Sequence, residues 1–189
     1  ATAGGWVPEF ALDGLLLQLD DLAAETADVY DFPNDWFDNA IAKNSVDGGI
    51  YGVQIHLTCA TLVYNVDMLN EAGFDAPPAT WEEFREVAIA TSKPGVFGFA
   101  PNSSLFYYWP WIFQNGGTYY DAETGEVGFG SAESVEAIQF LADLIHKDRA
   151  APVPVAGADY EGPQKLFTAE RAAMILTGPW DINPIRTGN

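Results

Sequence analysis

The chain has 189 residues, of which 27 are acidic and 8 are basic, so its formal net charge is −19. This charge repels phosphate backbones and anionic membrane surfaces, which argues against a nucleic-acid-binding protein or a peripheral membrane protein. Because 48% of the residues are hydrophobic and 14% are aromatic, the chain is also too apolar to be a disordered acidic tail.

Short elements separated by turn residues are predicted for the first third of the chain. The patterns predict a helix over 6–13 that Gly14 ends, a helix from Asn34 or Asp35 to about Lys43, and a turn at 47–49. The apolar stretch 50–65 follows, and it is too long for one ordinary strand. We expect either two strands or one long strand that passes between two sheets, with the break near residues 57–60.

The middle of the chain alternates between helical and strand patterns. It predicts helices over 66–72, 80–92 and 104–114, a buried strand over 96–100 and a hairpin over 118–129. The second of these helices begins with a capping box, in which Thr80 accepts the amide N–H of Glu83 while the Glu83 side chain reaches back.

The last part of the chain contains the most regular helical pattern. Ser131 is expected to cap this helix, whose buried face is predicted to hold Val135, Ile138, Leu141, Ala142 and Ile145. A helix over 161–169, a buried strand over 172–176 and a new helix beginning at Pro179 are predicted to follow. Because helices alternate with short apolar strands from residue 80 onward, the predicted fold class is α/β.

Sequence motifs for metal, phosphate or nucleophilic chemistry are absent. His56 and His146 are far apart, with no Cys or Asp pattern around either, so we expect no metal site and no cofactor. The single Cys59 cannot form an internal disulfide, and its apolar neighbours predict a small buried side chain. We therefore single out no catalytic residue, although 27 acidic residues leave a glycosidase-type carboxylate pair open.

Aromatic side chains crowd into residues 106–113, which read FYYWPWIF. One helix face cannot bury them all, so some ring surface is expected to border a groove or a partner. One interpretation is a stacking platform for sugar rings, in which Tyr107 and Trp109 pack against the C–H groups of a pyranose. The alternative is a bulky helix between two layers. Gly178 and Trp180 add a second indole site directly after a strand, at the strand end where α/β sheets bind ligands.

Several motifs, taken together and in this order, carry a family resemblance. They include GGIYGV, TLVYNVDMLNEAG, PPATWEEF, NGGTYY and SVEAIQFLADLI, and the most specific blocks are residues 64–84 and 167–180, the latter ending in GPW. The chain resembles the extracellular solute-binding proteins of ABC importers, in the sugar-binding branch that contains maltose-binding protein.

The resemblance implies an α/β, periplasmic-binding-protein-like bilobed fold whose lobes close on a ligand. It assigns residues 1–57 to part of lobe one and residues 58–189 to most of lobe two, with the crossover between lobes near residues 57–60. Family members are substantially longer, and the opening ATAGGWVPEF lacks the regions of a signal peptide, so we expect an excerpt of a longer protein. Open sheet edges in such an excerpt are expected to favour self-association.

The resemblance also implies which residues bind ligand. Trp180 matches the position at which sugar binders of the family stack a ligand ring; the alternative is a core-packing indole at a helix start. Thr58 and Ser104 stand where maltose-binding protein carries acids, which argues against maltose itself. The candidate ligand-binding residues are Trp180, Trp109, Tyr107, Ser104, Thr58, Trp6 and Gly178.

The implied function is that of the substrate-binding component of an ABC transporter, which captures a sugar or oligosaccharide and delivers it to the permease transmembrane subunits. Such a protein is not an enzyme, and the full-length form is expected to be monomeric, secreted or lipid-anchored, and extracellular or periplasmic at the cell surface. The acidic surface favours a halophilic source, because salt screens self-repulsion; an ordinary acidic protein is the alternative. Two other functions stay open, a carbohydrate-active enzyme and an adhesion or receptor-docking protein.

Overall fold

The computed structural model describes residues 6–55, 58–120, 124–155 and 161–188. The backbone divides into two compact units, Ala1–Thr58 and Cys59–Asn189, which are described separately below. The assignment of these units to the two lobes of a binding protein remains a prediction.

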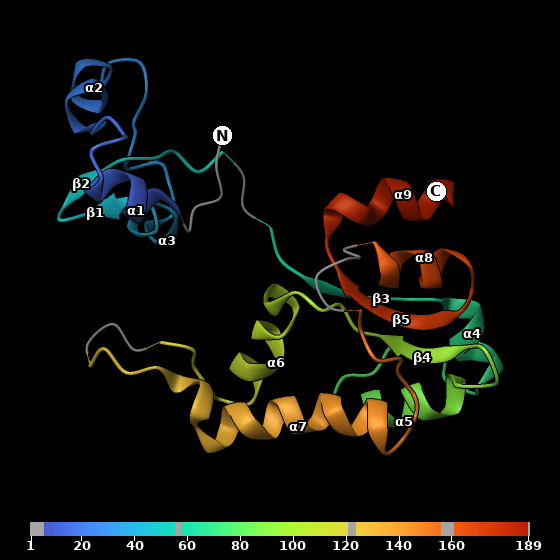
Figure 1. The fold of residues 1–189 in the computed structure, drawn as a ribbon. Helices are drawn as coiled ribbons and strands as arrows, with labels where there is room; N and C mark the ends of the chain where they lie inside the picture. The colour runs from blue at the N-terminus through green and yellow to red at the C-terminus, as the bar shows by residue number, and fades with distance from the viewer. Residues whose placement is uncertain (1–5, 56–57, 121–123, 156–160, 189) are drawn as a thin grey trace. The chain divides into compact units, whose positions relative to one another are not determined.

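The first unit consists of short helices and one hairpin (Figure 1). Its elements are α1 (Val7–Leu12), α2 (Asp20–Glu25), α3 (Asp38–Ala42), β1 (Ser45–Val46) and β2 (Gly49–Ile50). The predicted turn joins β1 to β2, because Asp47 and Gly48 both have positive φ, 49° and 84°, as a type I′ hairpin requires. The Asp20 carboxylate accepts the Ile50 N–H at 2.9 Å, and this bond holds the pKa of Asp20 below its ordinary value.

Three predictions for residues 34–60 are wrong in detail. The α3 helix begins at Asp38 rather than at Asn34 or Asp35, because the Asn34 side chain donates to Asp31 instead of capping a helix. No strand forms in the described residues 51–55 and 58–60 between β2 and the next strand. Cys59 is exposed rather than buried, since it lies in this irregular segment and not inside a strand. His56 lies outside the described residues.

The second unit contains a three-stranded sheet. Its strands are β3 (Thr61–Tyr64), β4 (Phe97–Ala100) and β5 (Ala172–Thr177), in the order β3-β5-β4. The central β5 runs parallel to β4 and antiparallel to β3, and it is almost entirely buried. This mixed sheet with helical connections confirms the predicted α/β class and the two predicted apolar strands, 96–100 and 172–176.

Helices cover both faces of the sheet. Figure 1 shows α8 and α9 on one side, and α5 and α7 on the other. The helices and 3-10 turns of the unit are α4 (Val66–Glu71), α5 (Trp81–Thr91), η2 (Leu105–Tyr107), α6 (Trp109–Gln114), η3 (Gly128–Gly130), α7 (Ala132–His146), α8 (Gly162–Thr168), η4 (Pro179–Asp181) and α9 (Ile182–Thr187).

The predicted helix caps are confirmed. Thr80 and Ser131 each accept the N–H of the residue three positions later, both at 3.2 Å. Glu83 also reaches back as expected, although its carboxylate accepts the N–H of Ala79 at 2.7 Å rather than that of Thr80. The predicted helix over 104–114 is split into η2 and α6, because Pro110 is suited to the first turn of a helix and not to its interior.

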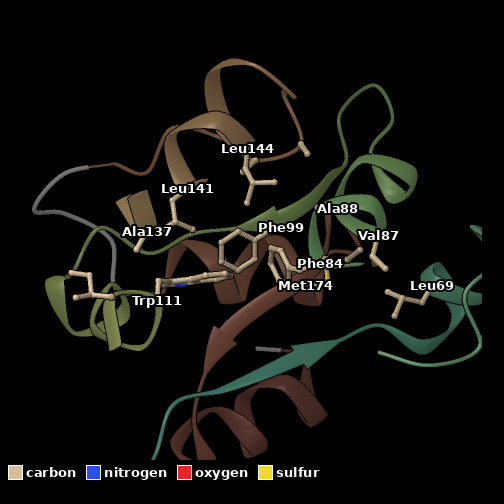
Figure 2. Close-up of a cluster of buried hydrophobic side chains, with 14 residues drawn as sticks. Leu69, Phe84, Val87, Ala88, Phe99, Trp111, Ala137, Leu141, Leu144 and Met174 are labelled. Carbon is tan, nitrogen blue, oxygen red and sulfur yellow. The ribbon is translucent and has the colours of Figure 1, made fainter. Parts of the chain in front are cut away.

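The main core lies between the sheet and the α5 and α7 helices. Figure 2 shows the aromatic rings of Phe84, Phe99 and Trp111 beside Met174 of the central strand. The centroid of the Phe84 ring lies 5.1 Å from those of Phe99 and Trp111, in edge-to-face contacts. A smaller cluster around Phe167 and Ile175 packs under α8.

The buried face of α7 differs from the prediction. Ser134, Ala137, Leu141 and Leu144 are buried, whereas Val135 and Ile138 are 55% and 39% exposed. The buried Ser134 hydroxyl donates to the Gly128 carbonyl at 2.9 Å, so the buried face of α7 includes a polar residue as well as apolar ones. The predicted hairpin over 118–129 is also wrong in the described residues 118–120 and 124–129, where no strand forms; residues 121–123 lie outside the description.

An ion pair joins α5 to the end of α7, and it leads to a stability prediction. Arg85 donates to Asp148 at 2.7 Å, and this bond raises the pKa of the guanidinium. The Asp148 side chain is only 9% exposed, and its second oxygen has no partner among the described residues. Replacing Arg85 with methionine is expected to lower the free energy of unfolding by about 1–2 kcal/mol, because it leaves a buried carboxylate without a donor.

Urea denaturation followed by circular dichroism measures this loss. The matched control is Lys147→Met, which removes the exposed cation that pairs with Asp143 at 3.3 Å. We expect that control to change the unfolding free energy by less than about 0.5 kcal/mol. Equal effects of the two substitutions would show that the burial of Asp148 does not increase the contribution of its ion pair to the unfolding free energy.

Candidate ligand-binding site

The carboxyl ends of β4 and β5 meet at one edge of the sheet, because the two strands are parallel. β4 leads through residues 101–104 into η2, and β5 leads directly into Gly178 and η4. The rings of Phe106 and Trp180, which follow the two strands, contact each other with centroids 6.0 Å apart and planes at 61°. The sheet therefore brings an aromatic pair to the strand end at which α/β folds bind ligands.

Trp180 lies folded back over the backbone that precedes it. A Cβ atom at Gly178 would come within 2.3 Å of the Cζ3 and Cη2 atoms of the indole, so the absence of a side chain at this position is what permits the contact. Trp180 as a residue is partly exposed, but its Nε1 atom is buried and finds no acceptor among the described residues. Gly178 itself is buried.

Two buried polar side chains bracket Trp180. Thr177, the last residue of β5, donates a hydrogen bond from its hydroxyl to the Asp181 carboxylate. The N–H of Asp181 in turn donates to the Gly178 carbonyl at 3.0 Å. Neither side chain was predicted from the sequence to belong to the site. The available signal was a Thr and an Asp four residues apart on either side of the GPW motif.

The residues after β4 present ring surface through Phe106 rather than through Tyr107. Phe106 is 47% exposed, whereas Tyr107 is 6% exposed and packs edge-to-face against it at 5.1 Å. Ser104 is exposed at the start of η2, where its N–H donates to the Asn102 side chain at 2.8 Å. Phe106 was not among the predicted candidates, and nothing in the FYYWPWIF run distinguishes it from its neighbours.

Trp109 belongs to a different aromatic group. Its ring lies 4.8 Å from Tyr119, 5.0 Å from Phe129 and 6.2 Å from Phe113, measured between centroids. Burial raises the pKa of the neighbouring Tyr108, so this phenol stays neutral at physiological pH. The structure thus brings Gly178, Trp180 and Tyr107 together around Phe106, and it places Trp109 in a separate cluster.

The remaining two candidates belong to the first unit. Trp6 is 57% exposed and its ring lies 6.3 Å from that of Phe10. Thr58 is exposed at the end of the unit. Both side chains therefore have surface to offer to a ligand.

None of the seven candidates lines either of two cavities in the second unit. One cavity, of about 340 Å³, is bounded by β3, by the start of α5 and by α6. In its wall the Trp81 indole donates a hydrogen bond to the Gln114 side chain at 3.0 Å. No charged side chain lines this cavity. The other, of about 440 Å³, lies beside Ser103 and α8 and has a mostly apolar lining.

The part of the chain that the structure describes contains no candidate metal site and no candidate membrane-spanning helix. No group of three or more His, Cys, Asp or Glu side chains there is arranged to hold a metal ion. No helix there has the length and hydrophobicity to cross a bilayer.

Comparisons with known proteins connect this geometry to one family. All 189 residues match the family model described as bacterial extracellular solute-binding protein. The maltotriose-binding protein of Pyrococcus abyssi is 25% identical over 186 residues, which make up 97% of this chain and 38% of that protein.

Two solved structures share the fold over nearly the whole chain. An ABC transporter solute-binding protein of Thermotoga lettingae, bound with α-D-tagatose, is 25% identical with a TM-score of 0.84, and the match covers 98% of this chain and 48% of that one. The GacH receptor of Streptomyces glaucescens was solved unliganded and with acarbose, and it is 26% identical with a TM-score of 0.85. The match covers 98% of this chain and 46% of the receptor. These likenesses confirm the predicted periplasmic-binding-protein-like fold. The chain spans less than half the length of each of these three proteins.

Proposed function

Because this chain belongs to the bacterial extracellular solute-binding protein family, we propose that it is part of a substrate-binding protein that captures a sugar or oligosaccharide for an ABC importer. The observation that carries the sugar class is the Trp180–Phe106 pair at the carboxyl ends of β4 and β5. The relatives named above, a maltotriose-binding protein and receptors solved with tagatose and acarbose, support the same ligand class.

The proposed ligand stacks one face of a sugar ring on the Trp180 indole. The C–H groups of a pyranose pack on the electron-rich ring face, while hydroxyl groups bond to polar atoms such as the Ser104 hydroxyl at the rim. Trp6 and Thr58 are proposed to contribute contacts from the first unit. Closure of the two lobes is then a population shift that contacts from both sides stabilise, and the permease complex favours release.

We propose binding without catalysis. A glycosidase needs a carboxylic acid positioned to protonate the leaving group, and none of the seven candidate ligand-binding residues is acidic. Members of the family are binding proteins, which supports the same conclusion.

The proposed location follows from the family description, which is of extracellular proteins. We expect the complete protein to act outside the cytoplasmic membrane, secreted or lipid-anchored at the cell surface, and as a monomer. The net charge of −19 supports function in concentrated salt, where screening removes the repulsion between carboxylates.

A thermal-shift titration in high salt tests the ligand class. A ligand that binds only the native state stabilises it by about 2.7 kcal/mol at 100 times its Kd, so the unfolding midpoint of the 189-residue chain must rise. We expect a saturable rise with at least one of maltotriose, tagatose and arabino-oligosaccharides, and none with a tripeptide or inorganic phosphate. A rise with the peptide alone would contradict the proposed sugar class.

A further inference from the structure

We propose that the buried hydrogen bond between Thr177 and Asp181 positions the Trp180 indole for ligand stacking. Neither side chain is proposed to touch the ligand; both act through the loop that carries Trp180. This inference rests on the proposed function, because Trp180 must be the stacking residue for its orientation to matter to binding.

The hydrogen bond closes a loop of five residues with Trp180 inside it. Thr177 ends the central strand β5, and Asp181 ends η4 and precedes α9. A second bond, from the Asp181 N–H to the Gly178 carbonyl at 3.0 Å, closes a four-residue backbone turn within this loop. The loop is thus tied at one end to the middle of the sheet and at the other to a helix, and only residues 178–180 lie between the ties.

Burial makes the side-chain tie strong. Thr177 is 3% exposed and Asp181 is 7% exposed, so neither can exchange its partner freely for water. A buried carboxylate without a donor is costly, because it has lost its hydration and gained nothing in return. Asp181 is therefore expected to keep the Thr177 hydroxyl as its donor in the native state.

The indole has no comparable tie of its own. Its buried Nε1 finds no acceptor among the described residues, so no hydrogen bond to them fixes the ring. The ring instead rests on the Gly178 backbone and against the Phe106 edge. Both contacts depend on where the loop backbone runs, so the Thr177–Asp181 bond sets the plane of the ring. A ring held in its binding orientation before the ligand arrives loses less entropy on binding.

The experiment compares three threonine substitutions. Thr177→Val keeps the shape of the side chain but removes the donor, and Thr177→Ser keeps the donor. Thr91→Val is the matched control, because Thr91 is also buried in the second unit and its hydroxyl donates within α5, to Val87 at 2.7 Å. Maltotriose and tagatose are the probes, and calorimetry gives the Kd of each variant.

We expect Thr177→Val to weaken sugar binding about 3- to 10-fold, and Thr177→Ser and Thr91→Val to leave the Kd unchanged within about 2-fold. A purely structural role predicts instead that Thr177→Val and Thr91→Val act alike. The second readout is the emission of Trp180, obtained by subtracting the spectrum of the Trp180→Phe form of each variant. We expect Thr177→Val to shift this emission and to increase its quenching by acrylamide, even without sugar.

An unchanged Trp180 emission and an unchanged Kd in Thr177→Val would overturn the positioning role. The proposed function fails in a different way, namely if Trp180→Ala binds the sugars as well as the native chain. If neither sugar binds any form, maltotriose and tagatose are not its ligands, and the emission and quenching of Trp180 still decide whether Thr177 positions the ring.

Discussion

Replacing Trp180 with alanine is expected to weaken sugar binding by about 1–3 kcal/mol, or about 5- to 150-fold in Kd. The partly exposed Trp180 is the proposed stacking residue at the carboxyl end of β5, and alanine removes its ring. Folding should suffer little by comparison, because Trp180 packs at the edge of the sheet, outside the core cluster around Phe99. Calorimetric titration with maltotriose and tagatose measures the change in Kd, and urea denaturation measures the change in unfolding free energy.

Trp36→Ala is the matched control for this substitution. Trp36 is also partly exposed, and its indole donates to the Gln54 carbonyl at 2.9 Å while its ring packs edge-to-face on Phe32. Its substitution is expected to destabilise the first unit without changing the Kd for sugar. If Trp180→Ala left the Kd unchanged, or if the two substitutions weakened binding equally, Trp180 would not be the stacking residue.

The elements that could be predicted from the sequence are those that local chemistry determines. The caps Thr80 and Ser131 work through backbone groups three residues away, so their signal lies within one turn. The same holds for the hairpin turn at Asp47-Gly48, where two residues must tolerate positive φ. The strands 96–100 and 172–176 were recognisable because both are short, apolar and buried.

The wrong predictions at α7 and α3 share one cause, which is a polar side chain whose hydrogen-bond partner is not indicated by the spacing of apolar residues. Apolarity alone favoured a face of α7 that includes Val135 and Ile138, whereas the buried face includes Ser134, whose hydroxyl donates to the Gly128 carbonyl. The helix start at Asn34 failed because Asp31, which is nearby in the chain, provides that side chain with another partner. No periodicity in the sequence carries this information, since each case depends on which partner the fold supplies.

In the candidate site, too, some residues could be predicted from a local motif and others could not. The GPW motif led to Gly178 and Trp180, because a strand followed by a helix start has a sequence signature. The exposure of Phe106 in place of Tyr107 was not predictable, since it depends on how η2 turns the two rings relative to the sheet. The buried Thr177–Asp181 bond was missed for a similar reason, because polar residues at a strand end are usually solvated.

Replacing Gly98 with alanine is expected to lower the unfolding free energy of the second unit by about 3 kcal/mol or more, which is a larger loss than that expected for Arg85→Met. A Cβ atom at this position in β4 would come within 1.8 Å of the Ala88 carbonyl oxygen and within 2.4 Å of the Ala88 carbonyl carbon. These atoms are backbone, so no change of rotamer can relieve the clash. The C-terminal turn of α5 must instead move away from the strand.

That movement would disturb interactions that hold α5 against the sheet. Ser92 donates to the Ala88 carbonyl at 2.7 Å and accepts the Gly98 N–H at 2.9 Å, so one hydroxyl connects the helix to the strand at this point. Val87 and Ala88 lie in the core cluster and would separate from Met174. A loss of about 3 kcal/mol is a large share of the 5–15 kcal/mol that typically stabilises a domain.

Urea denaturation of Gly98→Ala beside Gly130→Ala tests this expectation. Gly130 is the matched control, because a Cβ atom there meets nothing within 4 Å and its φ does not lie in the left-handed region. We expect the control to change the unfolding free energy by less than about 0.5 kcal/mol, and Gly98→Ala to lower the urea midpoint clearly at an unchanged slope. Equal midpoints for the two variants would mean that β4 and α5 can separate at no cost. The close packing of the helix on the strand would then not be what supports the sheet edge that presents Trp180.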